Sequence, residues 1–200
     1  MQGGLREMKK MYRLLLMTVL ALCLSIPALA AEAASIALLP LINNVKGDEI
    51  ANQVYFKSAI GAINAQKRFM LVENDKLTAV IDAAKIADKV PTKSTLEKIA
   101  KEGNVDIVIA MELDKLEDIT LYSSEANKLQ LVLDGKAAAY NKITGEFYQH
   151  RIYDDKTVPE ALTTRWDWTH EEWGRNVRAE INRILKVKKV QLDAPRMSKL

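Results

Sequence analysis

Apolar runs separated by polar turns divide the first half of the chain into predicted strands and helices. Residues 35–42 and 69–72 are short, mainly apolar runs, which is typical of buried strands. Between them, a helix is predicted from its cap at Asp48 to about Gln66, because apolar residues recur there at three- and four-residue spacing. The buried stripe of this helix consists of Phe56, Ala59, Ile60 and Ile63.

A second group of elements follows in the order helix, helix, strand. A short helix is expected around Leu77, then a surface loop, then a helix opened by a capping box of Ser94 and Glu97. Gly103 is predicted to end that helix in the left-handed conformation. Residues 106–111 are the most apolar of the predicted strands, so we expect them at the centre of the sheet.

Two later segments alternate apolar and polar residues and are predicted to pair as an antiparallel hairpin. The first covers residues 129–140 and the second covers 147–153. The turn between them contains Gly145, which is free to take a positive φ. Crossover connections in the first half and a hairpin in the second half together predict a mixed sheet.

A long helix is predicted to close the fold. It runs from about Thr169 to Lys188, with Thr169 and Glu172 as its capping box. Its apolar stripe consists of Trp173, Val177, Ile181, Ile184 and Leu185. The fold class expected from these elements is a single α/β domain, with a mixed sheet, packed helices and a long C-terminal helix.

The first thirty residues have the three parts of a secretory signal and are excluded from the fold. Basic residues including Lys9 and Arg13 precede an apolar run over 14–24, and the segment ends in an Ala-x-Ala sequence. That run is short of the roughly 20 residues that a spanning helix needs. We predict cleavage after Ala30, which removes the signal with its N-terminal extension (1–30) and leaves one domain (31–190) and a polar tail (191–200).

Cys23 is the single cysteine of the chain, and it lies inside the apolar run. The residue before it is leucine, whereas a lipoprotein signal has a small residue there, so the sequence does not favour a lipid anchor. After the predicted cleavage the chain has no cysteine, which excludes disulfides and cysteine-ligated zinc.

Charge also depends on the signal segment. Without residues 1–30, the 29 basic and 26 acidic residues of the chain become 25 of each. A net charge near zero means that the chain has no excess of basic residues with which to bind nucleic acid. The predicted partners therefore do not include nucleic acid, and no membrane span is expected after cleavage.

The order of elements resembles a group of bacterial envelope proteins that share the fold of the TolB N-terminal domain, CsgG and LpoB. The resemblance is carried by Ile-Ala-Leu-Leu-Pro at 36–40 with an Asn-containing loop after it, and by Leu-Val-Glu-Asn-Asp-Lys-Leu at 71–77. Further matches are Gly-Asn-Val-Asp-Ile-Val-Ile-Ala at 103–110 and the Thr-Gly-Glu turn at 144–146. The resemblance spans about 35–187 and implies an α/β fold in the cell envelope.

Two departures from this group narrow the resemblance. Met111 and Glu112 stand where the group has its glycine region, which puts any contact made there in doubt. The chain also has no room for the long membrane hairpins of CsgG-like pores, so it resembles the compact, non-pore members.

No complete catalytic, cofactor or metal constellation is found in the sequence. His170-Glu171 begins a zinc-protease pattern, but position 174 is glycine where the second histidine would stand, so His170 is interpreted as a surface residue at a helix start. Catalytic residues, cofactors and metal ligands are accordingly predicted to be none.

Three tryptophans lie close together near the final helix. Trp173 continues the apolar stripe and is expected in the core, whereas Trp166 and Trp168 precede the predicted cap. Tryptophan anchors protein partners well, so Trp166 and Trp168 are the candidate partner-binding residues.

The sequence leaves two classes of function open. The first is an exported, non-enzymatic accessory or adaptor protein of the periplasm or cell envelope that binds another envelope protein, of unknown oligomeric state. The alternative is a periplasmic small-ligand-binding protein or hydrolase that uses the carboxylates near Glu112. A pocket joining those carboxylates to Trp166 or Trp168 would favour the alternative, and a flat surface would favour the adaptor.

Overall fold

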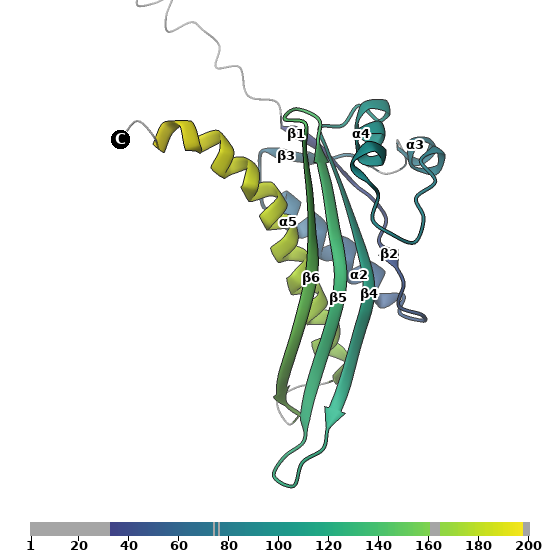
Figure 1. The fold of residues 1–200 in the computed structure, drawn as a ribbon, viewed down its shortest axis with the longest axis vertical. Helices are drawn as coiled ribbons and strands as arrows, with labels where there is room; N and C mark the ends of the chain where they lie inside the picture. The colour runs from purple at the N-terminus through teal and green to yellow at the C-terminus, as the bar shows by residue number, and fades with distance from the viewer. Residues whose placement is uncertain (1–32, 74, 76, 161–164, 198–200) are drawn as a thin grey trace, which may run out of the picture. The chain divides into compact units, whose positions relative to one another are not determined.

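The computed structural model describes residues 33–73, 75, 77–160 and 165–197, with side chains of the last helix described over 168–185. The predicted signal segment lies outside the described residues, so its cleavage stays a prediction. Residues from Ala33 onward belong to one compact unit. Its elements (Figure 1) are β1 (Ala34–Leu38), β2 (Ile42–Asn43), α2 (Ile50–Asn64), β3 (Phe69–Leu71), α3 (Thr78–Ala83), α4 (Lys93–Glu102), β4 (Ile107–Leu121), β5 (Lys128–Asn141), β6 (Glu146–Pro159) and α5 (Arg165–Met197).

The strands form one mixed, six-stranded sheet in the order β3-β1-β4-β5-β6, with β2 also pairing with β4. β1 is parallel to both its neighbours, with Ile36 opposite Leu71 on β3 and opposite Ile107 on β4. β5 lies between β4 and β6 and is antiparallel to each of them along the length of the strands. The predicted fold class, a single α/β domain with a mixed sheet and a long C-terminal helix, is confirmed.

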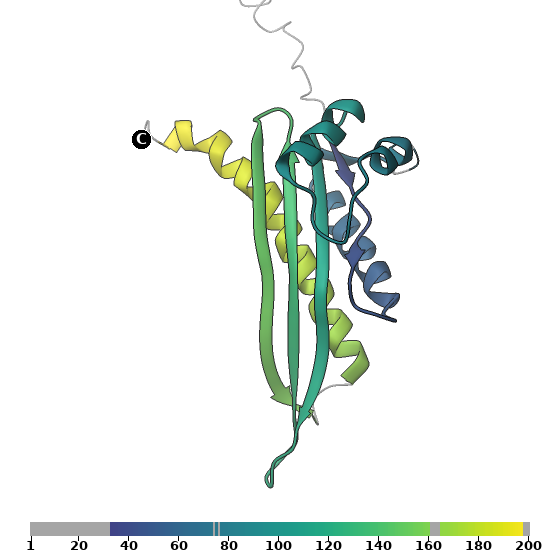
Figure 2. The same cartoon turned by 45° about the vertical axis from the view of Figure 1, so that its right-hand side comes forward.

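Helices cover the two faces of the sheet unequally. One face carries α2 and α5, and the core there includes Met111, Leu131 and Trp173. The other face carries α3 and α4, whose core includes Leu96 and Tyr140. In Figure 2, α4 lies over the upper ends of the strands with α3 beside it, whereas the lower parts of β4, β5 and β6 are bare on that side.

β4 is longer than the sequence pattern indicated. The predicted strand ended at residue 111, but β4 continues to Leu121, and its pairing with β5 is interrupted by a β-bulge between Leu113 and Lys115. The continuous apolar run ends near residue 111, and the bulge changes the side of the sheet to which the residues beyond it point, so the rest of the strand has no single periodic pattern. β6 likewise extends beyond the predicted 147–153 to Pro159.

Gly135 lies opposite the bulge, where the two strands approach closely. A Cβ atom at this position would stand 2.4 Å from the carbonyl oxygen of Glu112, which is part of the backbone of β4. Glycine is therefore required at this point of the ladder for the two strands to keep their approach.

Several predicted helix ends are placed differently by the structure. Thr92, and not Ser94, caps α4, because its side chain accepts a hydrogen bond from the Thr95 N–H. Gly103 has φ −79°, so the predicted left-handed glycine is wrong, and Asn104 takes the positive φ of 47° instead. Gly145 does have a positive φ, as predicted.

The closing helix also begins earlier than expected. α5 begins at Arg165, so Thr169 is inside the helix, and its hydroxyl donates to Asp118 on β4. Glu172 does not close a capping box, because its carboxylate binds Lys156 of β6 and Arg175. The predicted polar tail over 191–200 overlaps the end of α5. Among the helices that the structure describes, none is long and apolar enough to cross a membrane.

Candidate partner-binding surface

The lower half of the sheet presents one face that no described helix covers. Leu116, Leu131 and Ile152 point toward α5, so the residues that alternate with them point to the opposite side. We call this side, beyond the bulge, the open face. It consists of Lys115, Glu117, Ile119, Leu121, Lys128, Gln130, Val132, Asp134, Arg151, Tyr153, Asp155 and Thr157, all of them exposed or half-buried.

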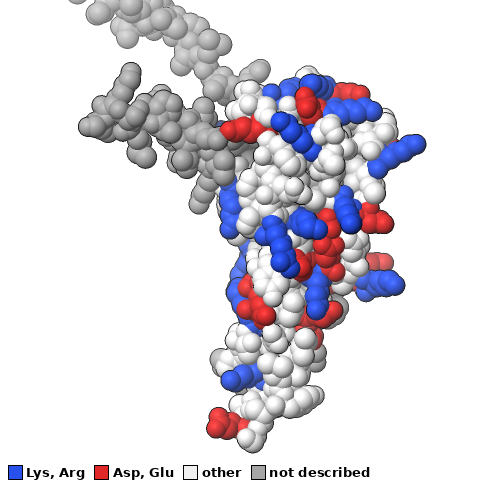
Figure 3. Space-filling model, in the orientation of Figure 1, with Lys and Arg blue, Asp and Glu red and all other residues white. Residues whose placement is uncertain are grey.

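Large apolar side chains are exposed on the open face and at the tip beside it. Ile119 and Leu121 on β4 and Tyr153 on β6 belong to the open face, and Tyr122 follows at the start of the β4–β5 turn with 83% of its surface exposed. Figure 3 shows charged residues gathered over the middle of this side and mainly uncharged atoms toward the β4–β5 turn. Exposed apolar groups bounded by charges are typical of protein contact surfaces.

Polar contacts across the strands hold part of the open face in place. Arg151 donates to both carboxylate oxygens of Asp134, at 2.8 and 2.6 Å, and its guanidinium lies over the ring of Tyr153. The hydrogen bond from Arg151 lowers the pKa of the Asp134 carboxyl below its usual range. Gln130 donates to Asp155 at 2.7 Å. These contacts restrict the rotamers of the side chains on the open face in the unbound protein. Less side-chain entropy is therefore lost when a partner binds.

The structure places Trp168 in the core and not at the surface. Only 8% of Trp168 is exposed, and it packs in the cluster between α2, α5 and the sheet. Trp173 is fully buried, as predicted, and its indole N–H donates to the carbonyl of Ala51 on α2 at 3.1 Å. The side chain of Trp166 lies outside the described residues, so its partner-binding role stays a prediction.

The carboxylate at Glu112 is buried on the opposite side of the sheet from Trp168. Its neighbours Met111 and Leu113 face α5, whereas Glu112 accepts a hydrogen bond from the Val90 N–H at 2.7 Å. Lys136 lies 3.6 Å from its other oxygen. The sheet therefore lies between Glu112 and Trp168.

The surroundings of Glu112 fasten a loop to the sheet. Only 1% of the residue is exposed, and this burial raises the pKa of its carboxyl, with Asp114 adding to the rise. Asn44 donates to Asp114 at 2.8 Å and to the carbonyl of Asp88 at 3.1 Å. The bond from Val90 to Glu112 connects the segment between α3 and α4 to β4, and Asn44 connects the same segment, through Asp88, to Asp114 on β4. The cluster therefore has a clear structural role.

His170 is also buried, which corrects its interpretation as a surface residue. It is 7% exposed, and its Nε2 lies 3.0 Å from both carboxylate oxygens of Asp48. Asp48 also accepts from the Ala51 N–H in the first turn of α2, although the N-cap residue is Glu49 and not Asp48 as predicted. Its contact with His170 holds α5 against α2. Over the described residues, no group of three or more His, Cys, Asp or Glu side chains could hold a metal ion.

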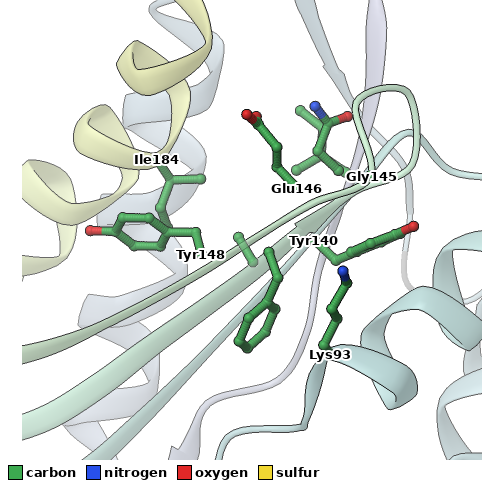
Figure 4. A pocket seen from close by; sticks show the side chains of 10 residues that line it. Lys93, Tyr140, Gly145, Glu146, Tyr148 and Ile184 are labelled. Atoms are coloured by element: carbon green, nitrogen blue, oxygen red, sulfur yellow. The ribbon is translucent and has the colours of Figure 1, made fainter. Parts of the chain in front are cut away.

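A cavity of about 520 Å³ lies at the end of the sheet near the β5–β6 turn. Figure 4 shows that its lining comes from both sides of the strands: Tyr148 and Ile184 on the α5 side, and Tyr140 and Lys93 on the α4 side. The volume suits a small ligand. The strands run between the two groups of side chains, however, so they do not converge on one point as the polar groups of a ligand site do.

The residues of the open face were missed by the sequence analysis because the strand was ended too early. In the segment Leu116-Glu-Asp-Ile-Thr-Leu121, two adjacent acidic residues break the alternation of apolar and polar residues that indicates a strand with one exposed side. Without the bulge, the register of that side could not be assigned. Ile119 and Leu121 therefore could not be placed on an exposed face.

No protein-family model and no curated protein matches the sequence. Solved structures with a similar fold include the hypothetical protein CT253 from Chlamydia trachomatis, at 12% identity and a TM-score of 0.49, covering 74% of this chain and 95% of that one. Lipoprotein GNA1162 from Neisseria meningitidis is similar at 13% identity and a TM-score of 0.42, covering 76% and 99%. The LpoB C-terminal domain from Salmonella enterica is similar at 15% identity and a TM-score of 0.37, covering 64% and 83%. At these identities the likeness concerns the fold, and the resemblance to TolB and CsgG in particular stays a prediction.

Proposed function

We propose that this protein is an exported accessory protein of the bacterial cell envelope that binds another envelope protein through the open face and the adjacent tip. The single observation that carries the proposal is the exposure of Ile119, Leu121 and Tyr122 together, at the uncovered end of three long strands. Leaving these side chains in water is unfavourable for the isolated chain, and a partner that covers them would remove that cost.

Two sequence features support the setting of this function. The N-terminal segment has the form of a secretory signal, which would place the domain outside the cytoplasm. The strand and turn motifs resemble those of envelope proteins of the TolB, CsgG and LpoB group. The proposed activity is binding alone, without catalysis. The carboxylate of Glu112 is buried and holds a loop against the sheet, so it is not accessible to a substrate as the alternative hydrolase would require.

The experiment compares two exposed isoleucines near opposite ends of the sheet. Ile119→Asp places a charge within the open face, whereas Ile143→Asp changes a residue that is 66% exposed in the β5–β6 turn. Both variants are expected to melt within a few degrees of the parent, since neither side chain is in the core. Each is expressed with a photo-crosslinking residue at position 121, and crosslinked products are measured in intact envelopes.

We expect one discrete crosslinked product from the parent and from Ile143→Asp, and a loss of about tenfold for Ile119→Asp, the size of effect that one charge in a binding centre produces. Equal crosslinking by all three proteins would refute the open face as the binding site. A product that also forms with the crosslinker moved to position 143 would show that the contact is not specific to this end of the sheet.

A further inference from the structure

β6 is a long edge strand that is free of other strands along its outer side. It runs from Glu146 to Pro159, and among the described strands it pairs with β5 alone. In Figures 1 and 2, β6 forms the margin of the sheet, and α5 crosses its face and does not run along its edge. Long free edges present unpaired N–H and C=O groups that can accept a further strand, so charges usually protect them.

The charges of β6 are arranged symmetrically about Tyr153 on the open face. Arg151 stands two residues before Tyr153 and Asp155 stands two residues after it, and all three side chains are exposed on the same side of the sheet. If a second β6 pairs antiparallel with its twofold axis at Tyr153, Arg151 of each copy lies directly opposite Asp155 of the other. Two ion pairs then flank a central pair of tyrosines.

Both charged groups keep the capacity for such a contact. Asp134 accepts from Nε and Nη2 of Arg151, so within the described residues the Nη1 amino group is available to another acceptor. Asp155 receives the Gln130 amide on Oδ1 and retains Oδ2. Tyr153 is 55% exposed beneath the Arg151 guanidinium, so two copies would meet through aromatic surface that is already ordered.

Charges on the other side of β6 are compensated within the chain. Asp154 accepts from Asn176, and Lys156 binds Glu172, both residues of α5. The charges of Asp154 and Lys156 are therefore compensated within one chain. The register between two copies of β6 is then determined by the charged residues of the open face.

Other antiparallel registers are less favourable. A twofold axis at Arg151, Asp154 or Asp155 sets that residue opposite its own copy, which brings like charges together. An axis at Ile152 avoids this, but it pairs Arg151 with Tyr153 and leaves Asp155 opposite Gln149 without a cation. Among these registers, the one centred on Tyr153 is alone in satisfying both open-face charges.

We propose that the free edge of β6 is a self-recognition site, at which a second copy of this chain pairs antiparallel about Tyr153 to form a continuous sheet. This pairing uses the edge of the sheet and leaves Ile119 and Leu121 of the open face free. Arg151, Tyr153 and Asp155 form the β6 margin of the open face, so the pairing shares this margin with the proposed partner site but is tested separately from the Ile119→Asp experiment.

The chain makes a direct test possible because Cys23 is its single cysteine. In a Cys23→Ser background, Tyr153→Cys introduces one thiol at the predicted axis, where opposite Cα atoms would be about 4.5–5.5 Å apart, within the range of a disulfide. Thr157→Cys is the matched control on the same strand and face, and it leaves Arg151 and Asp155 in place. Its two copies would lie eight residues apart along the strand, too far to be bridged.

Under mild oxidation we expect a disulfide-linked dimer from Tyr153→Cys and none from Thr157→Cys. Equal crosslinking of both, or of neither, would overturn the proposed register. Sedimentation over a range of concentrations provides the second measurement. Arg151→Asp and Asp155→Arg are each expected to weaken dimerisation by about tenfold, and the double variant to restore it, because the reversed charges again meet. Failure of the double variant to recover, with all variants folded by thermal melt, would overturn the proposal, as would a monomeric parent at every concentration.

Discussion

Replacing Trp173 by alanine tests how much of the domain depends on the docking of α5. Trp173 is fully buried between α5 and α2, and it is the largest of the fully buried side chains. Truncation of a buried tryptophan costs about 3–5 kcal/mol, because the removed area and the cavity left behind both contribute. The carbonyl of Ala51 also loses the indole N–H that it accepts at 3.1 Å.

That loss is a large part of the stability of a domain of this size, which is typically about 5–15 kcal/mol. Trp173→Phe separates the two contributions. It keeps most of the apolar area but removes the N–H, so it should fall between the parent and Trp173→Ala, with about 1 kcal/mol assigned to the hydrogen bond. Glu171→Ala is the control on the same turn, because its side chain is largely exposed and its pair with Arg175 contributes a few tenths of a kcal/mol.

Urea unfolding followed by far-ultraviolet circular dichroism gives the free energy of unfolding for each variant. We expect the midpoints to decrease in the order parent and Glu171→Ala, then Trp173→Phe, then Trp173→Ala, with equal slopes. A Trp173→Ala midpoint equal to that of the parent would refute the docking of α5 on α2 as the source of this stability.

Four further predictions concern other sites. Gly135→Ala should destabilise the fold by about 1–3 kcal/mol, because the added Cβ meets the Glu112 carbonyl oxygen. Gly61→Ala lies in α2 with open space around it and should stabilise the fold by about 0.5–1 kcal/mol, and thermal melts compare the two variants. Burial raises the pKa of the Glu112 carboxyl above 4.5, so the folded state disfavours the carboxylate and loses stability as pH rises through the folded pKa. The melting temperature of Glu112→Gln should therefore rise relative to that of the parent as pH increases. Glu112→Ala leaves the Val90 N–H unpaired and should melt lower than the parent at every pH. Trp168→Ala should lower the melting temperature by several degrees, since Trp168 is in the core, and an unchanged melt would contradict its burial. Intact-mass measurement of the exported protein should give a chain beginning at Ala31, and a mass that retains Met1, or a lipid on Cys23, would refute the predicted cleavage.

Much of the fold followed from apolar periodicity. The run at 35–42 is apolar without a break because β1 is buried on both faces of the sheet. The helices α2 and α5 each bury one side, which imposes a period that can be read from the sequence, although in the predicted stripe of α2 only Ala59 and Ile63 are buried and Phe56 and Ile60 are half-buried. The Thr-Gly turn was also predictable, because Gly145 has the positive φ that such turns require.

The misplaced elements depend on contacts between distant residues. Thr169 and Glu172 have the spacing of a capping box, but they bind Asp118 and Lys156 on the sheet instead. The bulge in β4 depends on Gly135, which lies 22 residues after Leu113 in sequence and directly opposite it in the sheet. No pattern within a short stretch of sequence indicates such contacts between distant residues. The extent of the open face depends on one such contact, the pairing of Leu113 with Gly135 at the bulge.

Trp168 shows why the candidate site could not be chosen from residue type. A tryptophan before a predicted cap was interpreted as available to a partner, but α5 begins earlier, at Arg165, and the extra turn carries Trp168 into the core. The exposed apolar residues are instead ordinary strand residues, Ile119 and Leu121, whose exposure depends on where α3 and α4 end.

The strand order has a consequence for how the chain folds as it emerges. β1 is the first strand in sequence, yet its two neighbours are Phe69–Leu71 and Ile107–Ile109, so it stays unpaired on at least one edge until the chain through Ile109 is present. β4, β5 and β6, by contrast, are joined by short turns and pair with their sequence neighbours, which makes their closure entropically less costly. We therefore expect folding to start from the hairpins of β4, β5 and β6, and the N-terminal third to add to a sheet that already exists. A chain that crosses a membrane unfolded, N-terminus first, would complete no stable part of this domain until most of it had arrived.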